Sequence, residues 1–292
     1  MAILVDNTTK VMFQGLTGTT ATRAAERAIA GGTDVVAGVR PGKGGGQHLN
    51  IPLFDGVAEA ARETGADATA VFVPPLQAAD AMIEAIEAEM PLIVCVTERI
   101  PVLDMIRVKE ALSGSKSRLI GPNSFGIISP GQCRIGVMPD RPHKPGRIGI
   151  ASRTATLTYS AVEQTSRVGL GQSTSVGVGG DPVHGIGFAE CLELFLADDA
   201  THGIVLIGEI GGTEEEEAAE LLQRVKPKKP VVACIVGIHT PPGRRMGHAG
   251  TVDPLGGGSA RDKIDALREA GVIIAESPGL IGHAMREALR HL

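Results

Sequence analysis

The feature that most constrains the fold is a series of short apolar runs, rich in Val and Ile, that alternate with helical patterns. In the first half of the chain, strands are expected at 10–14, 34–39, 68–73, 92–96 and 118–120. Helices are expected between them at 20–30, 55–64, 77–89 and 102–112. Strand–helix–strand repetition predicts a parallel sheet with right-handed crossovers.

A second series follows and has the same character. Strands are expected at 147–151, 173–178, 203–207, 231–236 and 272–275, and helices at 156–167, 187–197, 213–225, 259–270 and 281–292. Residues 123–146 interrupt the rhythm with many Gly and Pro residues, which is typical of a linker containing a short extended stretch. The sequence therefore predicts an α/β protein with one domain over 1–122, a linker over 123–146 and a second domain over 147–292.

Composition narrows the choice of partners. The 292 residues are 43% hydrophobic and 21% charged, and the net charge is −5. No basic stretch is long enough to bind a polyanion, so we expect no nucleic-acid partner. With six Phe, one Tyr and no Trp, stacking platforms for bases are scarce as well.

The four cysteines and the amino terminus bear on localisation. Cys95 and Cys234 lie inside expected strands, Cys133 and Cys191 lie elsewhere, and none suggests a disulfide framework. The start MAILVDNTTK lacks the layout of a signal peptide, and no apolar run approaches the length of a membrane span. We expect a cytoplasmic protein without membrane contact.

A first candidate site lies between the first expected strand and helix, where residues 15–21 read Gly-Leu-Thr-Gly-Thr-Thr-Ala. Small residues at a helix N-terminus leave backbone N–H groups free to bind phosphate. The spacing is not the G-x-G-x-x-G fingerprint, so a purely structural turn is an equal alternative. At the end of the second strand, where an NAD site has Asp or Glu, the chain has Arg40 and then Lys43 in a glycine loop. The two turns together favour a nucleotide with an extra phosphate, such as NADP or coenzyme A.

A second candidate site combines two strand ends. Residues 152–159, Ser-Arg-Thr-Ala-Thr-Leu-Thr-Tyr, follow a strand and place hydroxyls where helix caps and anion contacts are wanted. Ordinary capping explains one or two of these hydroxyls and leaves Arg153 unexplained. Glu209 follows another strand, at the edge where α/β sheets bind ligands. The acidic run 214–217 is expected to form a capping box on a solvated helix start, with Thr213 as N-cap and Glu216 at the third helical position.

His248 lies in the segment Arg-Arg-Met-Gly-His-Ala-Gly at 244–250. Glycines on both sides allow close approach, and Arg244 and Arg245 can offer forked donors to phosphate oxygens. A solvated loop histidine is the commoner alternative, but this setting suits a histidine that receives a phosphoryl group and passes it on. Glu209 could bond one ring nitrogen of His248 and fix its tautomer.

Taken in order, these residues resemble the α subunits of the succinyl-CoA synthetases, also called succinate–CoA ligases. The likeness covers nearly the whole chain, and its specific pieces are 15–18, 41–45, 97–98, 120–123, 157–159, 179–182, 208–212 and 247–250. The resemblance implies an N-terminal Rossmann-like CoA-binding domain followed by a flavodoxin-like parallel-sheet domain.

The resemblance also implies roles for individual residues. His248 would be phosphorylated and Glu209 would steady it. Coenzyme A would contact nine positions, namely Thr17, Gly18, Thr19, Thr20, Lys43, Val96, Thr97, Glu98 and Asn123. The phosphate and the carboxylic acid would lie beside Ser152, Thr154, Ala155 and Tyr159.

The reaction implied by the resemblance is formation of an acyl-CoA from a dicarboxylate, CoA and ATP or GTP, as in the tricarboxylic acid cycle. Phosphate would pass from the triphosphate to the histidine and then to the acid, and the CoA thiol would displace it from the acyl phosphate. The chain has no G-x-x-x-x-G-K-[ST] loop, so an ATP-grasp β subunit would hold the triphosphate and Mg²⁺. The assembly would be a heterodimer or a heterotetramer, with no metal ligands on this chain.

Several positions depart from the family pattern. Thr154-Ala155 replaces Ser-Gly, Ser160 replaces Glu, Ala21 replaces Gly, and Ser124-Phe125 replaces Cys-Pro, with Phe125 beside the expected path of the pantetheine arm. The changes around the acid pocket leave succinate, malate and related dicarboxylates open. A non-catalytic CoA-binding module and an NADP oxidoreductase remain as alternatives of other classes.

Overall fold

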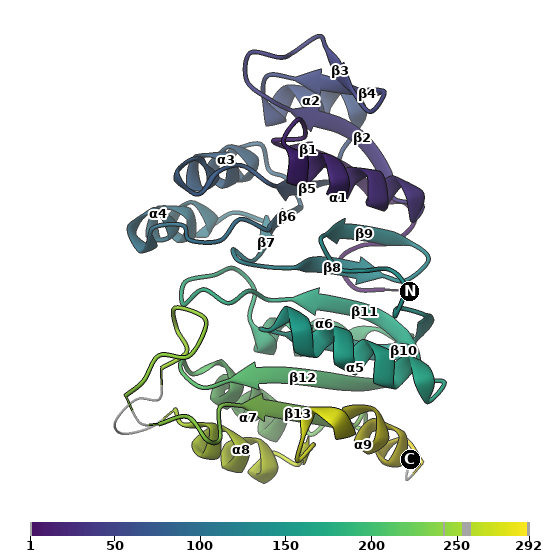
Figure 1. Ribbon diagram of the computed structural model, residues 1–292, viewed down its shortest axis with the longest axis vertical. Helices are drawn as coiled ribbons and strands as arrows, with labels where there is room; N and C mark the ends of the chain where they lie inside the picture. The colour runs from purple at the N-terminus through teal and green to yellow at the C-terminus, as the bar shows by residue number, and fades with distance from the viewer. Residues whose placement is uncertain (1, 242, 253–257, 291–292) are drawn as a thin grey trace. The chain divides into compact units, whose positions relative to one another are not determined.

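The computed structural model describes residues 2–241, 243–252 and 258–290 (Figure 1). Its contacts divide the chain into two units. The amino-terminal unit contains Leu4–Met138 and Val183–Ile186, and the carboxyl-terminal unit contains Pro139–Pro182 and Gly187–Leu292 with the first residues of the chain. Each unit contains a set of parallel strands covered by helices.

The amino-terminal sheet has the strand order β3-β4-β2-β1-β5-β6-β7. Its strands are β1 (Lys10–Gln14), β2 (Asp34–Val39), β3 (Gln47–His48), β4 (Ile51–Phe54), β5 (Ala68–Val71), β6 (Leu92–Cys95) and β7 (Arg118–Ile120). All neighbouring pairs are parallel except β3 with β4. Without β3, this is the 3-2-1-4-5-6 order of the Rossmann fold, as the sequence predicts.

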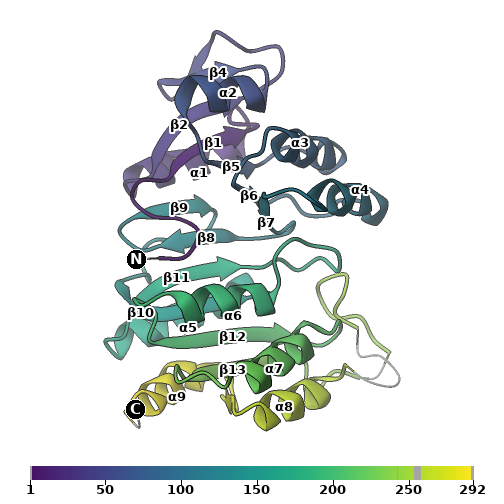
Figure 2. The ribbon, with the colours of Figure 1, turned by 180° about the vertical axis from the view of Figure 1, so that it is seen from behind.

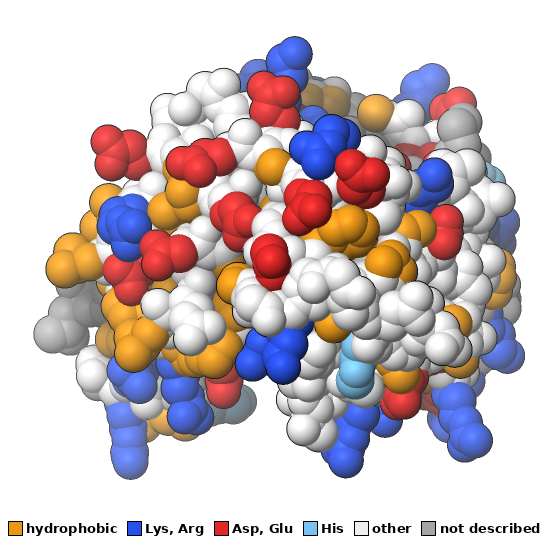
Figure 3. All heavy atoms as spheres, turned by 90° about the horizontal axis from the view of Figure 1, so that it is seen from above, with side chains coloured by type: hydrophobic (Ala, Val, Ile, Leu, Met, Phe, Trp, Pro, Cys, Tyr) orange, Lys and Arg blue, Asp and Glu red, His pale blue; other side chains and the backbone are white. Residues whose placement is uncertain are grey.

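Helices cover both faces of this sheet. They are α1 (Thr19–Ala30), α2 (Val57–Thr64), α3 (Pro75–Glu87) and α4 (Val102–Leu112). The last three share one apolar core with the strands, which includes Val57, Met82 and Val108. Helix α1 buries an alanine stripe at i, i+3, i+4 and i+7 and lies on the opposite face, in front in Figure 1 and behind in Figure 2. Viewed onto the β3–β4 end, this unit shows acidic and basic side chains with hydrophobic ones between them (Figure 3).

In the carboxyl-terminal unit, five parallel strands have the order β14-β13-β12-β10-β11. They are β10 (Pro145–Ser152), β11 (Gln172–Gly177), β12 (Gly203–Glu209), β13 (Val231–Val236) and β14 (Ile273–Ile274). Numbered from β10, this is the 2-1-3-4-5 order of flavodoxin-like sheets, which confirms the predicted fold class.

The helices of this unit are α5 (Ala155–Arg167), α6 (Phe188–Ala197), α7 (Glu214–Val225), α8 (Ala260–Glu269) and α9 (Ile281–Ala288), with a short 3-10 helix η1 (Pro278–Leu280) before α9. Helices α5 and α9 pack together over a core that includes Ile150, Val205 and Val232. Helices α7 and α8 also pack against each other. In sheets of this order, ligands bind at the carboxyl edge where the strand order reverses, here between β10 and β12.

The expected linker over 123–146 differs from the observed structure. It contains an antiparallel hairpin, β8 (Gly126–Ser129) with β9 (Cys133–Gly136), and the boundary between the units falls after Met138. The glycines that suggest a linker permit close backbone approach instead. A Cβ on Gly126 would lie 2.0 Å from the Ile135 carbonyl oxygen, and one on Gly136 would lie 2.5 Å from that of Phe125. Phe125, which the sequence places beside the expected path of the pantetheine arm, is 5% exposed.

All four cysteines are free and buried. Burial raises the pKa of the Cys133 thiol to about 12 and also raises that of Cys234. The thiols of Cys133 and Cys234 therefore favour the protonated, unreactive form, as expected for small core residues. Within the described ranges, no helix combines the length and apolar character needed to cross a bilayer.

Candidate functional site

The predicted phosphate turn lies at the carboxyl edge of the amino-terminal sheet, between the end of β1 and the start of α1. Gly15 has φ +82°, and a Cβ there would lie 3.2 Å from the Phe72 carbonyl oxygen, so the turn runs close to the end of β5. Gly18 is the N-cap of α1, and no described side chain caps the helix. The first N–H groups of α1 are thus available to an anion, with the half-buried Thr17 and the exposed Thr19 and Thr20 around them.

Two neighbouring loops carry positive charge towards this turn. Arg40, at the end of β2, donates from Nη1 to Thr17 Oγ1 over 3.0 Å. The following loop is shaped by Asp55, whose Oδ1 accepts the N–H groups of Lys43 at 3.0 Å and Gly44 at 2.8 Å. These backbone hydrogen bonds, that of Gly44 first, lower the pKa of Asp55. The Lys43 side chain is exposed, so its ammonium is accessible to a ligand phosphate.

The remaining CoA candidates lie at the same sheet edge, after β6 and β7. The hydroxyl of Thr97 donates to the Val73 carbonyl over 2.7 Å, and the Asn123 N–H donates to the Thr97 carbonyl over 2.9 Å. Val96 is half-buried and Glu98 is exposed. These bonds tie the ends of three strands together at one rim.

A cavity of about 740 Å³ opens at this rim. Its lining includes the ends of β1, β2 and β5, through Gln14, Gly18, Arg40 and Phe72, and the start of α3. Gly18 is the one predicted CoA residue in the lining of this cavity; the others lie along the strand ends outside it. The volume suits a ligand of the size of a nucleotide.

In the carboxyl-terminal unit, His248 lies at the tip of a tight turn. The N–H of Thr251 donates to the His248 carbonyl over 3.1 Å, and the N–H of Met246 donates to the Thr251 carbonyl over 2.8 Å. An isolated antiparallel bridge between Arg245 and Val252 closes the base of the turn. The imidazole is 31% exposed, so it is anchored in the turn and still open to solvent.

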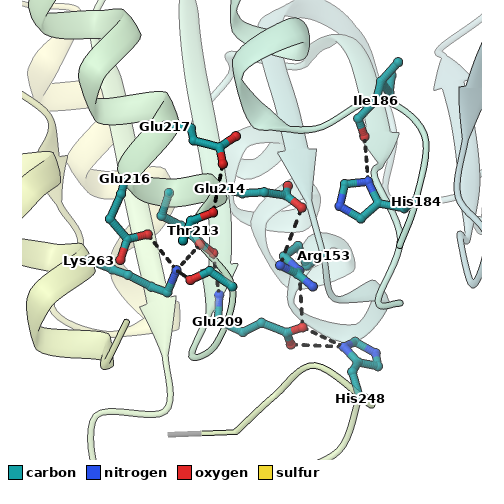
Figure 4. Close-up of polar contacts among 12 residues, drawn as sticks. Arg153, His184, Ile186, Glu209, Thr213, Glu214, Glu216, Glu217, His248 and Lys263 are labelled. Carbon is teal, nitrogen blue, oxygen red and sulfur yellow. Dashed lines mark hydrogen bonds and ion pairs between the residues drawn. The ribbon is translucent and has the colours of Figure 1, made fainter. Parts of the chain in front are cut away.

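Glu209, the last residue of β12, holds the histidine ring as the sequence predicts (Figure 4). Both carboxylate oxygens lie 3.0 Å from His248 Nδ1. Because Nδ1 faces the carboxylate, it is the nitrogen that carries the proton, and Nε2 is left as the nitrogen that can react. The pair joins a strand end and a turn at the carboxyl edge of one sheet, at the point where the strand order reverses.

Arg153 is the guanidinium nearest this pair. Its Nε lies 3.3 Å from Glu209 Oε1, and its Nη1 lies 3.7 Å from Glu214 Oε1 at the start of α7 (Figure 4). The side chains of Arg153 and Glu209 are 4% and 6% exposed, so this is a buried ion pair. Arg244 and Arg245, which the sequence favours as phosphate ligands, are exposed on the loop instead.

The environment raises the pKa of His248 above its ordinary value. The hydrogen bond to Glu209 is the largest cause, and the charges of Glu209 and Asp181 act in the same direction. Partial burial and the charge of Arg153 oppose them. The site therefore favours a positively charged imidazole ring, which is the state that an N-phosphorylated histidine also has.

Glycines make room for this arrangement. A Cβ on Gly180, after β11, would lie 2.7 Å from His248 Cγ and Cδ2, so the ring packs directly against the backbone there. Gly211 has φ +85°, and a Cβ on it would lie 2.0 Å from the carbonyl oxygen of Gly250. The glycines of the motifs at 179–182 and 208–212 thus let the histidine turn pack directly against the neighbouring backbone.

The residues predicted beside the phosphate lie at the start of α5. Ser152 is buried, and its hydroxyl bonds the N–H and the carbonyl of Thr154, which fixes the turn. Thr154 is the N-cap residue, yet its side chain makes no capping hydrogen bond within the described part of the chain. Ala155 and Tyr159 are half-buried. The helix therefore begins with backbone N–H groups not covered by a side-chain cap.

Thr213 is the N-cap of α7 and Glu216 its third residue, as predicted, but the predicted capping box and solvated helix start are wrong. Thr213 makes no capping bond to α7, and its hydroxyl donates to Glu217 over 2.8 Å. Glu215 is 1% exposed, and Lys263 of α8 pairs with Glu215 and Glu216 at 2.6 and 2.8 Å. Buried cationic partners, which lie far away in sequence, outweigh local capping.

Sequence reasoning missed Glu215 and Lys263, although a signal was present. Glu215 occupies the apolar stripe of α7 with residues 218, 219 and 222, and Lys263 occupies that of α8 with 260, 264 and 267. A charged residue at a core-facing position of an amphipathic helix indicates a buried partner. Arg153 was recognised only as a residue that capping leaves unexplained.

Comparison with known proteins follows the same division of the chain. Residues 6–99 match the CoA binding domain family, and residues 151–273 match the CoA-ligase family. The α subunit of the ADP-forming succinate–CoA ligase of Staphylococcus aureus is 48% identical over 99% of this chain and 96% of its own length. The corresponding subunit of Aquifex aeolicus is 49% identical over 99% and 95%. The chain belongs to the family of succinate–CoA ligase α subunits.

A solved structure confirms the fold of this chain. ATP citrate lyase from Methanothrix soehngenii, in complex with citrate and coenzyme A, superposes with a TM-score of 0.88 at 23% identity. The match covers 99% of this chain and 51% of the lyase chain, so this chain spans about half the lyase length. The family is one of NDP-forming acid–thiol ligases, and its α subunits carry a CoA-binding domain before a CoA-ligase domain.

Proposed function

We propose that this chain, with a β subunit, forms succinyl-CoA from succinate, CoA and a nucleoside triphosphate through a phosphohistidine at His248. The observation that carries the proposal is the contact of Glu209 with Nδ1 of a half-exposed His248. It gives the ring one anchored nitrogen and one reactive nitrogen. That division is what a residue needs if it must accept a phosphoryl group and release it again.

In the first transfer, the lone pair of Nε2 attacks the γ-phosphorus, the P–N bond forms, and the bond to the leaving diphosphate breaks. The imidazole becomes positively charged because Nδ1 keeps its proton. Glu209 stabilises that charge at 3.0 Å. Arg153 holds the carboxylate in place and limits how strongly the resting ring binds a proton.

In the second transfer, a carboxylate oxygen of the acid attacks phosphorus and the P–N bond breaks, which yields an acyl phosphate. The CoA thiolate then attacks the acyl carbon, and phosphate leaves with the electrons of the C–O bond. Negative charge on the phosphoryl oxygens favours the uncovered N-terminus of α5 at Thr154 and Ala155. Tyr159 lies one turn into the same helix, where it would border the acid.

Coenzyme A belongs to the amino-terminal unit in this proposal. The N-terminus of α1, Arg40 and the exposed Lys43 surround one rim of the sheet, and a cavity opens there. Val96, Thr97, Glu98 and Asn123 extend the rim. Two positive side chains and free helix N–H groups fit the phosphates of CoA.

The triphosphate and Mg²⁺ are assigned to an ATP-grasp β subunit. The family models match CoA-binding and CoA-ligase segments of this chain, and the relatives are named as α subunits. The sequence contains no G-x-x-x-x-G-K-[ST] loop. A carrier histidine on a turn is the means by which a phosphoryl group reaches this chain from another subunit.

The acid is assigned as succinate from the relatives. Thr154, Ala155 and Ser160 differ from the residues usual in the family, so the preferred acid is determined by direct assay. Comparing kcat/KM for succinate, malate, itaconate and citrate in the reconstituted complex decides it. A higher value for malate would replace the assignment without affecting the phosphohistidine.

Labelling tests the carrier role. The complex with the β subunit, given triphosphate labelled at the γ-phosphate and Mg²⁺, should acquire label on this chain that is stable in base and lost in acid. His248→Asn should abolish the label. The matched control is His239→Asn, an exposed histidine nine positions earlier, which should leave labelling unchanged. Label that persists in His248→Asn would assign the carrier to another residue.

A further inference from the structure

Lys263 is a fully buried lysine with no part in the transfers described above. Its side chain is 0% exposed, and its ammonium contacts three oxygens. It donates to Glu215 Oε2 over 2.6 Å, to Glu216 Oε2 over 2.8 Å and to the Gly212 carbonyl over 2.9 Å (Figure 4). Burying an ammonium is unfavourable unless such partners surround it, so this position is specified by its contacts.

Glu215 connects the lysine to the histidine site. Its Oε2 accepts from Lys263, and its Oε1 accepts the backbone N–H of Glu209 over 3.0 Å. The carboxylate packs tightly under β12, because a Cβ on Gly208 would lie 2.3 Å from Glu215 Oε1. One carboxylate thus joins α8 to the residue that holds His248.

The turn from Glu209 to Gly212 is therefore fixed at both ends. Glu215 holds the N–H of Glu209 at its start, and Lys263 holds the carbonyl of Gly212 at its end. Between them, the Gly211 N–H donates to the Gly258 carbonyl over 3.2 Å. The two side chains that hold the ends are also ion-paired with each other, so neither end can move independently.

We propose that Lys263 and Glu215 are positioning residues for the phosphohistidine, acting through the backbone of Glu209. The proposal rests on the carrier role proposed for His248. Glu209 must hold the ring both before and after phosphorylation, although the charge on the ring changes. Fixing its backbone from beneath keeps the carboxylate aimed at Nδ1 in both states.

The pH dependence of His248 provides a readout that reports on this geometry. The groups that set its pKa are Glu209, Arg153 and Asp181, with Glu214 beyond Arg153. None of these is altered by changing Lys263. Loss of the Lys263 charge by itself raises the pKa of His248, so a fall in that pKa on substitution of Lys263 reports displacement of Glu209, whereas a lysine that only stabilises the fold gives no fall.

The test uses the full chain in complex with its β subunit and the variant Lys263→Met, which keeps the length of the side chain and removes its charge. The rate of acylation of His248 by diethyl pyrocarbonate, followed by peptide mass spectrometry, gives the pKa of the ring because only the neutral imidazole reacts. We expect the midpoint to fall by about half a pH unit towards the ordinary histidine value. We also expect histidine phosphorylation to slow roughly tenfold.

Two further variants keep the test decisive. The double variant Lys263→Met/Glu215→Gln leaves no buried carboxylate without a cation, so it should fold even if the single variant does not. The amide oxygen of Gln at position 215 can still accept the backbone N–H of Glu209. The double variant should show the same direction of shift, because the Gly212 carbonyl still loses Lys263 and that end of the turn is no longer held. Glu216→Gln is the matched control, because Glu216 also binds Lys263 but has no contact with Glu209. It should leave both readouts unchanged.

The outcomes separate this proposal from the carrier role. An unchanged or raised acylation midpoint in both folded Lys263 variants would overturn the positioning role, whatever happens to activity. Absence of phosphorylation in the unmodified complex would overturn the carrier role, while the acylation profile would still show whether Lys263 and Glu215 hold Glu209 in place.

Discussion

At the scale of the residue, one carboxylate and one guanidinium act in opposite directions on the pKa of His248. Glu209 contacts Nδ1 and raises the pKa of the ring, while Arg153 contacts the same carboxylate and lowers it. A protonated Nε2 cannot attack phosphorus, so a pKa raised too far would slow phosphorylation at neutral pH. The opposed charges keep the ring ready for both states, neutral before transfer and charged after it.

Replacing Glu209 by Gln should separate these effects. The raised pKa means that the ring keeps its proton up to a higher pH than an ordinary histidine, and the rate of phosphorylation rises with pH as that proton is lost. In Glu209→Gln the pKa falls, so the rise occurs at lower pH. The plateau should fall roughly tenfold to a hundredfold, because the charged phosphoimidazole loses its counter-ion. Single-turnover phosphorylation measured against pH reports both changes, and an unshifted profile would show that Glu209 does not govern the titration.

Replacing Arg153 should shift the profile the other way. In Arg153→Met the positive charge that lowers the pKa of His248 is gone, so the rise in rate moves to higher pH. The buried carboxylate of Glu209 and the partly buried one of Glu214 lose a partner, and we expect the free energy of unfolding to fall by roughly 3 kcal/mol. The same pH series and a denaturant titration measure the two effects. A shift to lower pH would mean that Arg153 acts mainly by orienting Glu209.

Substitution of Gly180 tests whether the imidazole of His248 packs against the backbone at this position. Ala at this position would put a methyl group 2.7 Å from the ring, although the backbone there needs no unusual φ. We expect Gly180→Ala to displace His248 and to slow phosphorylation by roughly a hundredfold. Gly279→Ala is the control, since the nearest atom to its Cβ lies 3.8 Å away. Equal rates in the two variants would show that the ring is not held against the backbone.

At the scale of the element, local patterns predicted strands and helices well. The strands β1, β2, β7 and β13 and the helix α4 have the predicted bounds, because apolar periodicity and flanking breakers are local properties. The strand β4 was not predicted, since Pro52 argues against a strand and is tolerated only near a sheet edge. The hairpin β8–β9 was missed because its glycines serve close backbone contact.

The candidate site was also predictable only where the signal was local. Pairing of Glu209 with His248 was predicted, because both residue types and their strand-end positions are visible in the sequence. The contacts of Arg153, Glu215 and Lys263 join residues that are tens of positions apart, and no local pattern gives their partners. Their positions on buried strand ends and apolar helix faces showed only that some partner must exist.

At the scale of the whole molecule, each unit presents its own candidate binding site at the carboxyl edge of its parallel strands. The amino-terminal unit provides the phosphate turn, Lys43 and a cavity, and the carboxyl-terminal unit provides the histidine and its carboxylate. The two sets of residues share no side chain. Changes in one unit should therefore act on one step of the reaction only.

Lys43→Ala tests this division. Loss of the charge proposed to bind the CoA phosphates should raise KM for CoA by roughly tenfold, which corresponds to about 1.4 kcal/mol. Phosphorylation of His248 from the triphosphate should be unaffected. Lys116→Ala, an exposed lysine of the same unit, is the control and should change neither quantity. A slower phosphorylation step in Lys43→Ala would show that the two sites are coupled.

The position of the phosphoryl group on the ring tests the central claim most directly. With Nδ1 held by Glu209, we expect ³¹P NMR of the phosphorylated complex, or fragmentation of its phosphopeptide, to place phosphorus on Nε2 of His248. Phosphorus bound to Nδ1 would contradict the account, because the nitrogen in contact with Glu209 would then be the one that carries the phosphoryl group.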